Sequence, residues 1–258
     1  MCLILFSLQQ HEAYPLVVIA NRDEYYARPT QTAHWWPDIQ GIFAGRDLEA
    51  RGTWMGVNIN GRFAAVTNVR ESGSFGPARL SRGKLARDFL SSRDPAETFL
   101  KSIESSADDY AGFNLLVGDS SGLYFYSNRH AGIRCIQPGI YGISNGMFDE
   151  HWPKLESGKQ ALADALQQGI DDDILMRILT DDAPVNDGAL PKTGVSPDIE
   201  RLLSSRFIRS PDYGTRASSL VRFGRDKQVS FIEQNFVNSG EIGVLIKENF
   251  QITGVRLD

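Results

Sequence analysis

Pairs of short apolar runs joined by tight turns fill the N-terminal two-thirds of this chain and limit its fold more than any other feature. The runs at 54–59 and 63–67 flank Asn60-Gly61-Arg62, and an Asn-Gly turn between two apolar runs is a strong hairpin signal. Three further pairs have the same form: 3–7 with 16–21, 113–117 with 123–126, and 133–136 with 140–144. The sequence therefore predicts four antiparallel hairpins.

Helical patterns lie between and after these strands. Apolar residues recur at helical spacing in 84–90, 96–102, 152–168, 174–179 and 199–203. Asp94 and Pro95 suit the N-cap and first position of the second helix. Residues 181–197 read as a surface loop, two strands follow at 218–223 and 229–236, and the tail 242–255 could add a strand or extend past the domain. Strands, helices and strands again predict an α+β fold, and no linker divides 1–258, so we expect one domain.

Composition excludes several classes of protein. The chain has 258 residues, 41% hydrophobic and 23% charged, which is ordinary for a globular protein. Its formal net charge of −5 gives no electrostatic reason to expect a nucleic acid partner. Its apolar runs are too short for a bilayer span. No Lys or Arg precedes the first run, as a secretory signal peptide would require. Two cysteines are too few for a disulfide framework. We expect a cytoplasmic protein without stable membrane insertion, with reduced thiols and no metal site.

Cys2 is the candidate nucleophile. Removal of Met1 requires a small second residue, and Cys is small enough, so Cys2 could carry a thiol and a free α-amine together. An α-amine, whose ordinary pKa is about 7.7–8.0, can take the proton from its own side chain. The alternative is a small buried thiol that opens the first strand.

Four polar residues, Asn21-Arg22-Asp23-Glu24, end the second apolar run, which we expect to pair with the first. Side chains alternate along a strand, so Asn21 and Asp23 share one face and Arg22 faces the other side. Asp23 could orient the amine of Cys2. The alternative is a solvated strand end with a surface ion pair.

Cys2 and five further segments resemble the NRDE family, also called the transport-and-Golgi-organisation family. These segments are residues 21–29, 52–56, 112–116, 141–145 and 213–216. The resemblance spans nearly the whole chain. It implies an N-terminal-nucleophile hydrolase fold, a four-layer αββα sandwich with two stacked antiparallel sheets. It also implies links to intracellular haem trafficking and to lipid or acyl-CoA homeostasis.

A more distant resemblance, to bile salt hydrolases and penicillin V acylases, implies roles for particular residues. These enzymes share the αββα fold and begin with a mature N-terminal Cys. Asp23 is similar to the Asp of their second strand. Their Arg lies three residues before that Asp, where this chain has Ala20, so Arg22 is the candidate replacement. Asn68 is similar to their oxyanion-hole Asn, and Asn145 to a second functional Asn.

Three arginines near the C-terminus are candidates for a further site residue. Arg206 and Arg209 lie in a segment that resembles the amidases, whereas Arg216 carries the NRDE-family motif. An Arg beside a thiolate lowers the pKa of that thiol. Two preorganised donors, such as the amides of Asn68 and Asn145, could hold a tetrahedral oxyanion. The alternative for each Asn is a turn residue that satisfies its own backbone.

Two hypotheses of different classes follow. In the first, the protein hydrolyses a non-peptide amide or a thioester without a cofactor: Cys2 attacks, Asp23 orients the amine, and Asn68 and Asn145 hold the oxyanion. In the second, it carries haem on the same fold without turnover. His34, before Trp35-Trp36-Pro37 on a predicted loop, is then the candidate haem ligand, and the alternative for it is packing of that loop over the sheet. A third hypothesis is acyl-CoA or lipid binding in the same cleft.

Three further features have a prediction of their own. Leu80-Ser81-Arg82-Gly83-Lys84 opens a predicted helix and could bind an anion there or form a capped surface turn. His151, beside Trp152 at a helix start, is a second possible haem contact. Cys135 lies inside a predicted strand, and we expect it in the core.

Overall fold

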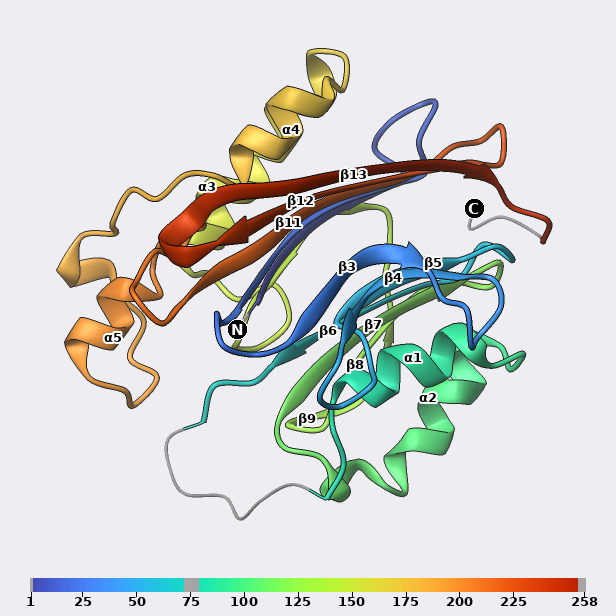
Figure 1. Ribbon diagram of the computed structural model, residues 1–258, viewed down its shortest axis with the longest axis horizontal. Coiled ribbons are helices and arrows are strands. Elements are labelled where there is room, and N and C mark those ends of the chain that lie inside the picture. Colours follow the sequence, from blue (N-terminus) through green and yellow to red (C-terminus); the bar gives the residue numbers. More distant parts are fainter. Residues whose placement is uncertain (1, 72–78, 255–258) are drawn as a thin grey trace.

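The computed structural model describes residues 2–71 and 79–254 and contains two antiparallel sheets (Figure 1). The first sheet has the strand order β10-β1-β2-β11-β12-β13, and the second runs from β3 to β9 in chain order. The strands of the first sheet are β10 (Gly139–Ile143), β1 (Cys2–Leu8), β2 (Leu16–Tyr25), β11 (Tyr213–Phe223), β12 (Gln228–Val237) and β13 (Glu241–Gln251). Those of the second are β3 (Thr30–Trp35), β4 (Ile42–Asp47), β5 (Met55–Asn58), β6 (Phe63–Asn68), β7 (Phe113–Asp119), β8 (Gly122–Ser127) and β9 (His130–Cys135).

Helices cover the outer faces of both sheets. They are α1 (Gly83–Ser91), α2 (Ala96–Glu104), α3 (Pro153–Gln167) and α4 (Asp172–Ile178), whereas the short α5 (Pro197–Leu202) lies in the connection before β11. Figure 1 shows α3 and α4 on one side of the stacked sheets and α1 and α2 on the other. Separate hydrophobic cores fill the three gaps between layers, around Phe89 under α1, Phe231 between the sheets and Leu155 under α3. This order of layers confirms the predicted αββα sandwich.

Strand β1 explains how the fold brings Cys2 to the space between the sheets. Its run Leu3-Ile4-Leu5-Phe6 is apolar at every position because both faces of the strand are covered. Ile4 and Phe6 pack between the sheets, whereas Leu3 and Leu5 pack under α3 and α4. Side chains alternate along the strand, so Cys2 shares the inner face with Ile4.

Three of the four predicted hairpins are confirmed, and the fourth is wrong. β1 pairs with β2, β5 with β6, and β7 with β8. The runs around Pro138-Gly139 do not pair with each other, because β9 joins β8 and β10 joins β1 in the other sheet. Turn chemistry marks where the chain changes direction, but the strand it then joins depends on which apolar face needs covering. Ile143 of β10 is buried in the core between the sheets beside Ile4.

The predicted helices are all present within two residues of their expected ends. Helix α2 begins at Ala96, where the apolar spacing predicts it, but its N-cap is Pro95 and not Asp94. Strands β3 and β4 were not predicted, and the tail adds β13, while residue 255 lies outside the described residues. In the described ranges no helix is both long and apolar enough to cross a membrane.

Candidate active site around Cys2

Cys2 lines a pocket of about 120 Å³ between the two sheets. It is the first residue of β1, and its backbone is paired with that of Arg22 on β2. Burial raises the pKa of the Cys2 thiol, the charge of Asp23 adds to this effect, and Arg22 opposes it. The resting sulfur is therefore a neutral thiol that needs a base before it can attack. Removal of Met1, which would provide that base, concerns a residue outside the described ranges and stays a prediction.

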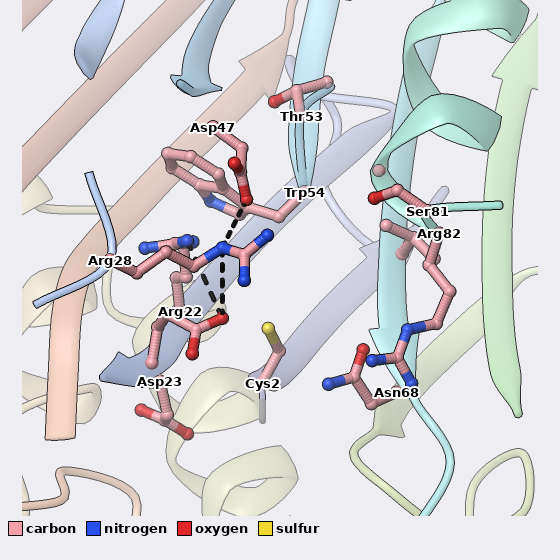
Figure 2. Close-up of a pocket in the computed structure, with 13 residues that line it drawn as sticks. Cys2, Arg22, Asp23, Arg28, Asp47, Thr53, Trp54, Asn68, Ser81 and Arg82 are labelled. Carbon is pink, nitrogen blue, oxygen red and sulfur yellow. Dashed lines mark hydrogen bonds and ion pairs between the residues drawn. The ribbon is translucent and has the colours of Figure 1, made fainter. Parts of the chain in front are cut away.

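The end of β2 distributes its polar side chains between two faces, as the alternation predicts. Arg22 points to the inner side with Cys2, and its guanidinium lies 4.5 Å from the centre of the Trp54 ring. Asn21 faces the helices, where its amide donates to the carbonyls of Leu179 and Arg206, each at 2.8 Å. Figure 2 shows the Cys2 sulfur between the Arg22–Asp23 wall and the wall that carries Asn68 and Arg82.

Asp23 is a buried carboxylate with partners on the opposite face. Thr215 Oγ1 donates a hydrogen bond of 2.8 Å to its Oδ1, and the hydroxyl of Tyr213 donates to its backbone carbonyl at 3.1 Å. Burial raises the pKa of Asp23, whereas the charge of Lys154 and the Thr215 bond lower it. The carboxylate thus lies beside the start of the chain, where it could orient an α-amine on Cys2.

Lys154 is a site residue that the sequence analysis missed. Its side chain is 5% exposed, and its Nζ donates 2.9 Å to the carbonyl of Leu203. Burial lowers the pKa of Lys154 to about 8, and the charges of Asp23 and Cys2 act against that effect. Its position in α3 could have revealed it, because Lys154, Gly158 and Leu162 follow the i, i+4, i+8 spacing of the buried helix face.

Asn68 and Asn145 have different places in the structure. Asn68 ends β6 and lines the pocket, and Figure 2 shows its amide on the side of the cleft facing the Cys2 sulfur. Asn145 does not line this pocket: its Nδ2 donates 2.8 Å to the backbone carbonyl of Asn68. The direct oxyanion role predicted for Asn145 therefore does not fit its position. It instead fixes the strand end from which the Asn68 side chain projects.

A second group of hydrogen bonds joins the two sheets at the same end of the cleft. Thr67 Oγ1 donates 2.6 Å to the carbonyl of Ser144. Asn114 Nδ2 donates 2.9 Å to the carbonyl of Gly146. These contacts tie β6 and β7 to the segment after β10. The segments around Asn114 and Ser144, which resemble the NRDE family, thus have a structural role beside the pocket.

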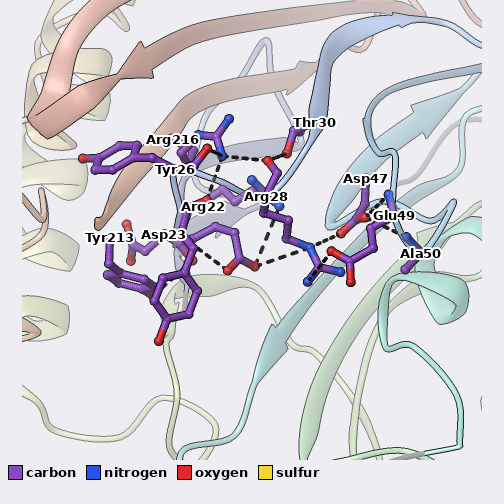
Figure 3. A network of polar contacts seen from close by, with 12 residues as sticks. Arg22, Asp23, Tyr26, Arg28, Thr30, Asp47, Glu49, Ala50, Tyr213 and Arg216 are labelled. Atoms are coloured by element: carbon purple, nitrogen blue, oxygen red, sulfur yellow. Dashed lines mark hydrogen bonds and ion pairs between the residues drawn. The ribbon is translucent and has the colours of Figure 1, made fainter. Parts of the chain in front are cut away.

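The C-terminal arginines do not line the pocket. Arg216 Nη1 donates to the carbonyls of Tyr25, Tyr26 and Arg28 at 2.9, 3.2 and 3.0 Å and so holds the turn after β2 (Figure 3). The catalytic position predicted for Arg216 is corrected to this clamping one, because its guanidinium is used by backbone carbonyls. Arg206 binds Ser157 and Asp181, and Arg209 binds Asp182, all on the helical side of the first sheet.

The opposite wall of the pocket comes from the start of α1. Ser81, Arg82 and Gly83 line it, and Arg82 Nη1 donates 3.2 Å to the carbonyl of Gly112. The segment before β5 approaches this helix start closely, since a Cβ on Gly52 would lie 2.4 Å from the carbonyl carbon of Gly83. This contact fixes Thr53, whose N–H donates 3.1 Å to the Gly83 carbonyl, and so positions Trp54.

Arg28 belongs to an ion-pair network at the mouth of the pocket, which reaches Arg22 through Glu24. Its Nε lies 2.6 Å from Asp47 Oδ2, and its Nη1 lies 3.4 Å from Glu49 (Figure 3). Asp47 also accepts from the N–H groups of Glu49 and Ala50, at 3.0 and 2.8 Å. The charges of Arg28 and Asp47 are therefore paired within the protein.

Two histidines and a cysteine lie away from Cys2. His34 is on β3, not on a loop as predicted; its Nδ1 is 2.8 Å from the carbonyl of Thr32, and it does not line the pocket. His151 is exposed and contacts Glu156 at 3.1 Å. Cys135 is exposed on the edge strand β9, so the prediction that it is in the core is wrong.

These positions do not favour a haem site or a metal site. His151 lines a cavity that His34 does not reach, and haem binding stays a prediction. Within the described ranges no three His, Cys, Asp or Glu side chains are placed to hold a metal ion.

Comparisons with known proteins agree with this architecture. A family model described as Transport and Golgi organisation 2 matches residues 1–238. The chain is 33% identical over 264 residues to the Transport and Golgi organization protein 2 homolog of Bos taurus, covering 93% of this chain and 94% of that protein. It is 31% identical over 260 residues to the Homo sapiens homolog, covering 92% and 94%. The solved structure of penicillin V acylase from Agrobacterium tumefaciens has a TM-score of 0.51 at 13% identity, covering 95% of this chain and 90% of that one, and this likeness concerns the fold alone.

Proposed function

The chain belongs to the Transport and Golgi organisation 2 family and has an N-terminal-nucleophile hydrolase fold, and we propose that it hydrolyses a non-peptide amide or a thioester through Cys2. The observation that carries this proposal is the arrangement around the thiol. Cys2, Asp23 and Asn68, taken from three strands in two sheets, line one pocket. They are the residue types that a nucleophile, an orienting carboxylate and an oxyanion donor require.

In the proposed acylation step, removal of Met1 frees the α-amine of Cys2, and this amine takes the thiol proton. The sulfur then bonds to the substrate carbonyl carbon, and the carbonyl π electrons move onto oxygen. The Asn68 amide stabilises this oxyanion. The intermediate collapses when the bond from carbon to the leaving nitrogen or sulfur breaks, and the leaving group takes the proton from the ammonium. A thioester on Cys2 remains.

Deacylation repeats the same roles with water as nucleophile. The α-amine takes a proton from water, whose oxygen attacks the thioester carbonyl. Collapse breaks the carbon–sulfur bond, releases the carboxylic acid and returns the proton to the sulfur. Asp23 holds the amine in position throughout, and the buried ammonium of Lys154 favours the ionised form of Asp23. Because the resting thiol has a raised pKa, the attack needs a base, and in this scheme the α-amine of the same residue is that base.

Acyl-enzyme trapping tests the proposal on the purified full chain. Intact-mass spectrometry should show loss of Met1, and a long-chain acyl β-lactone should form one covalent adduct that maps to Cys2. Cys2→Ala should abolish the adduct. Cys135→Ala is the matched control, because Cys135 is the other free cysteine and lies on an exposed edge strand, so this variant should label like wild type. Retention of Met1, or labelling that follows Cys135 instead of Cys2, would contradict the proposal.

A further inference from the structure

Arg22 is a buried cation with an unused hydrogen-bonding arm. Its side chain is 5% exposed, and its Nη1 is buried with no hydrogen-bond partner among the described residues. A guanidinium stays protonated at any physiological pH. Burial of Nη1 without a partner therefore costs free energy that deprotonation does not relieve. The stacked ring of Trp54, 4.5 Å away, covers one face of the guanidinium and leaves its edge for a partner.

The carboxylates near Arg22 do not accept a hydrogen bond from its Nη1. Arg22 Nη2 lies 3.9 Å from Glu24 Oε2, beyond hydrogen-bonding distance, and the same oxygen lies 3.9 Å from Arg28 Nε. Asp47 is engaged by Arg28 at 2.6 Å. Asp23 faces the other side of the strand, where Thr215 binds it. The described part of the protein therefore gives Arg22 one long ion pair to Glu24 and no carboxylate that accepts a hydrogen bond from its Nη1.

A second cation, Arg82, lines the pocket across from Arg22. Arg82 donates to the carbonyl of Gly112, and within the described part of the chain no carboxylate lies in ion-pair distance of it. It stands at the start of α1, a nine-residue helix with no side-chain cap and no acidic residue in its first turn. A helix start without such groups favours an anion. Figure 2 places Arg82 beside Asn68 and across from Arg22, with the Cys2 sulfur between the two walls.

From these observations we propose that the substrate carries a compact anionic group, a carboxylate or a phosphate, close to its scissile carbonyl, and that Arg22 and Arg82 bind this group from opposite walls of the Cys2 pocket. The inference rests on the proposed hydrolase function and adds a substrate class to it. Arg22 comes from strand β2 and Arg82 from the start of helix α1, so an anion between them would also bridge the two walls of the cleft.

The positions of the two arginines limit how far the charge can lie from the reacting carbon. Arg22 and Arg82 line the same pocket as Cys2, and this pocket has a volume of about 120 Å³. An anion held by both arginines therefore lies close to a carbonyl that the Cys2 sulfur can reach, and a long acyl chain extends through the mouth of the pocket.

Binding to a variant without the nucleophile separates this inference from turnover. We would titrate Cys2→Ala, as a full chain, with three amides that share a decanoyl chain: N-decanoylglycine, N-decanoyl-O-phosphoethanolamine and the neutral N-decanoylethanolamine. At least one anionic amide should bind about tenfold or more tightly than the neutral one, as expected for charge-assisted hydrogen bonds. The carboxylate and phosphate ligands identify which anion the pocket prefers.

Substitutions then test the two arginines. In the Cys2→Ala background, Arg82→Met should remove the preference for the anionic amide, measured as the ratio of the dissociation constants of the neutral and anionic amides. Arg22→Lys retains a charge but not the planar two-armed donor, so it should weaken the preference. Arg201→Met is the control, since Arg201 pairs with Asp187 and Asp198 at the surface, and it should behave like its parent.

The outcomes are distinguishable. Equal binding of charged and neutral amides, or a preference that survives Arg82→Met, overturns the anion site whatever the protein catalyses. A clear preference in Cys2→Ala, together with no acyl-enzyme in the Cys2-containing protein, supports the anion site and overturns hydrolysis.

Discussion

Asn68 and Asn145 are joined by one hydrogen bond, but only Asn68 lines the pocket. The Asn145 amide donates to the Asn68 backbone carbonyl, whereas the Asn68 amide lines the pocket with Cys2. Within the described ranges nothing donates to or accepts from the Asn68 side chain. An amide that is held by its backbone and is free at its side chain suits a donor whose partner is formed only during reaction.

This difference predicts opposite effects for two alanine substitutions. Asn68→Ala should lower the acylation rate by about 10²–10³-fold, as loss of an oxyanion donor does, and leave the thermal unfolding temperature nearly unchanged. Asn145→Ala should lower the free energy of unfolding by about 1–3 kcal/mol, because it leaves a buried carbonyl without its donor. The rate of acylation by the β-lactone measures the first effect, and thermal unfolding measures the second. An Asn68→Ala variant that acylates at the wild-type rate would exclude the oxyanion role.

At the scale of elements, the site depends on how closely the segment before β5 approaches the start of α1. Gly52 permits that contact, because a Cβ there would lie 2.4 and 2.5 Å from the carbonyl carbon and oxygen of Gly83. Backbone atoms cannot move aside as a flexible side chain can. The contact fixes Trp54, which in turn holds Arg22, and it brings Arg82 to the pocket.

Gly52→Ala should therefore disturb stability and reactivity together. We expect a loss of about 1–3 kcal/mol in the free energy of unfolding, the usual cost of overpacking, and slower labelling of Cys2 by the β-lactone. Gly188→Ala is the matched control, since the nearest atom to its added Cβ is Asn186 Oδ1 at an ordinary 3.6 Å. A Gly52→Ala protein that melts and labels like Gly188→Ala would show that this contact is dispensable.

At the scale of the whole molecule, Glu233 joins the two sheets through a fully buried carboxylate. Its Oε1 accepts from the N–H of Ala33 on β3 at 2.8 Å and from Asn235 Nδ2 at 3.1 Å, whereas its Oε2 is buried without a partner. Burial raises the pKa of Glu233 above its ordinary value. The native state therefore holds this proton more tightly than the unfolded chain does.

The sign of the pH dependence follows from this raised pKa. The contribution of Glu233 to stability is fully present below the unfolded value of about 4.3 and is lost as pH rises through the folded pKa. Glu233→Gln keeps one acceptor oxygen without the charge, so it should melt at a higher temperature than wild type at pH 7, by a margin that shrinks toward pH 4. Glu97→Gln, at the surface beside Lys101, should show no such pH-dependent gain. A lower melting temperature for Glu233→Gln at pH 7 would refute this account.

The sequence by itself determined the features that depend on neighbours along the chain. Alternation put Arg22 on one face of β2 and Asn21 and Asp23 on the other, and turn chemistry produced the hairpins β1–β2, β5–β6 and β7–β8. Helical periodicity placed all five helices. The resemblance to known families added the αββα stacking, which local patterns alone leave open.

Tertiary structure alone decided which distant side chains meet at the thiol. Lys154 beside Asp23, Trp54 over Arg22, and Arg82 opposite them come from segments far apart in sequence. It also placed β9 and β10 in different sheets and moved Arg216 out of the pocket. The physical reason is range: strand and turn preferences act over a few residues, whereas these contacts arise only when two sheets and their helices pack face to face.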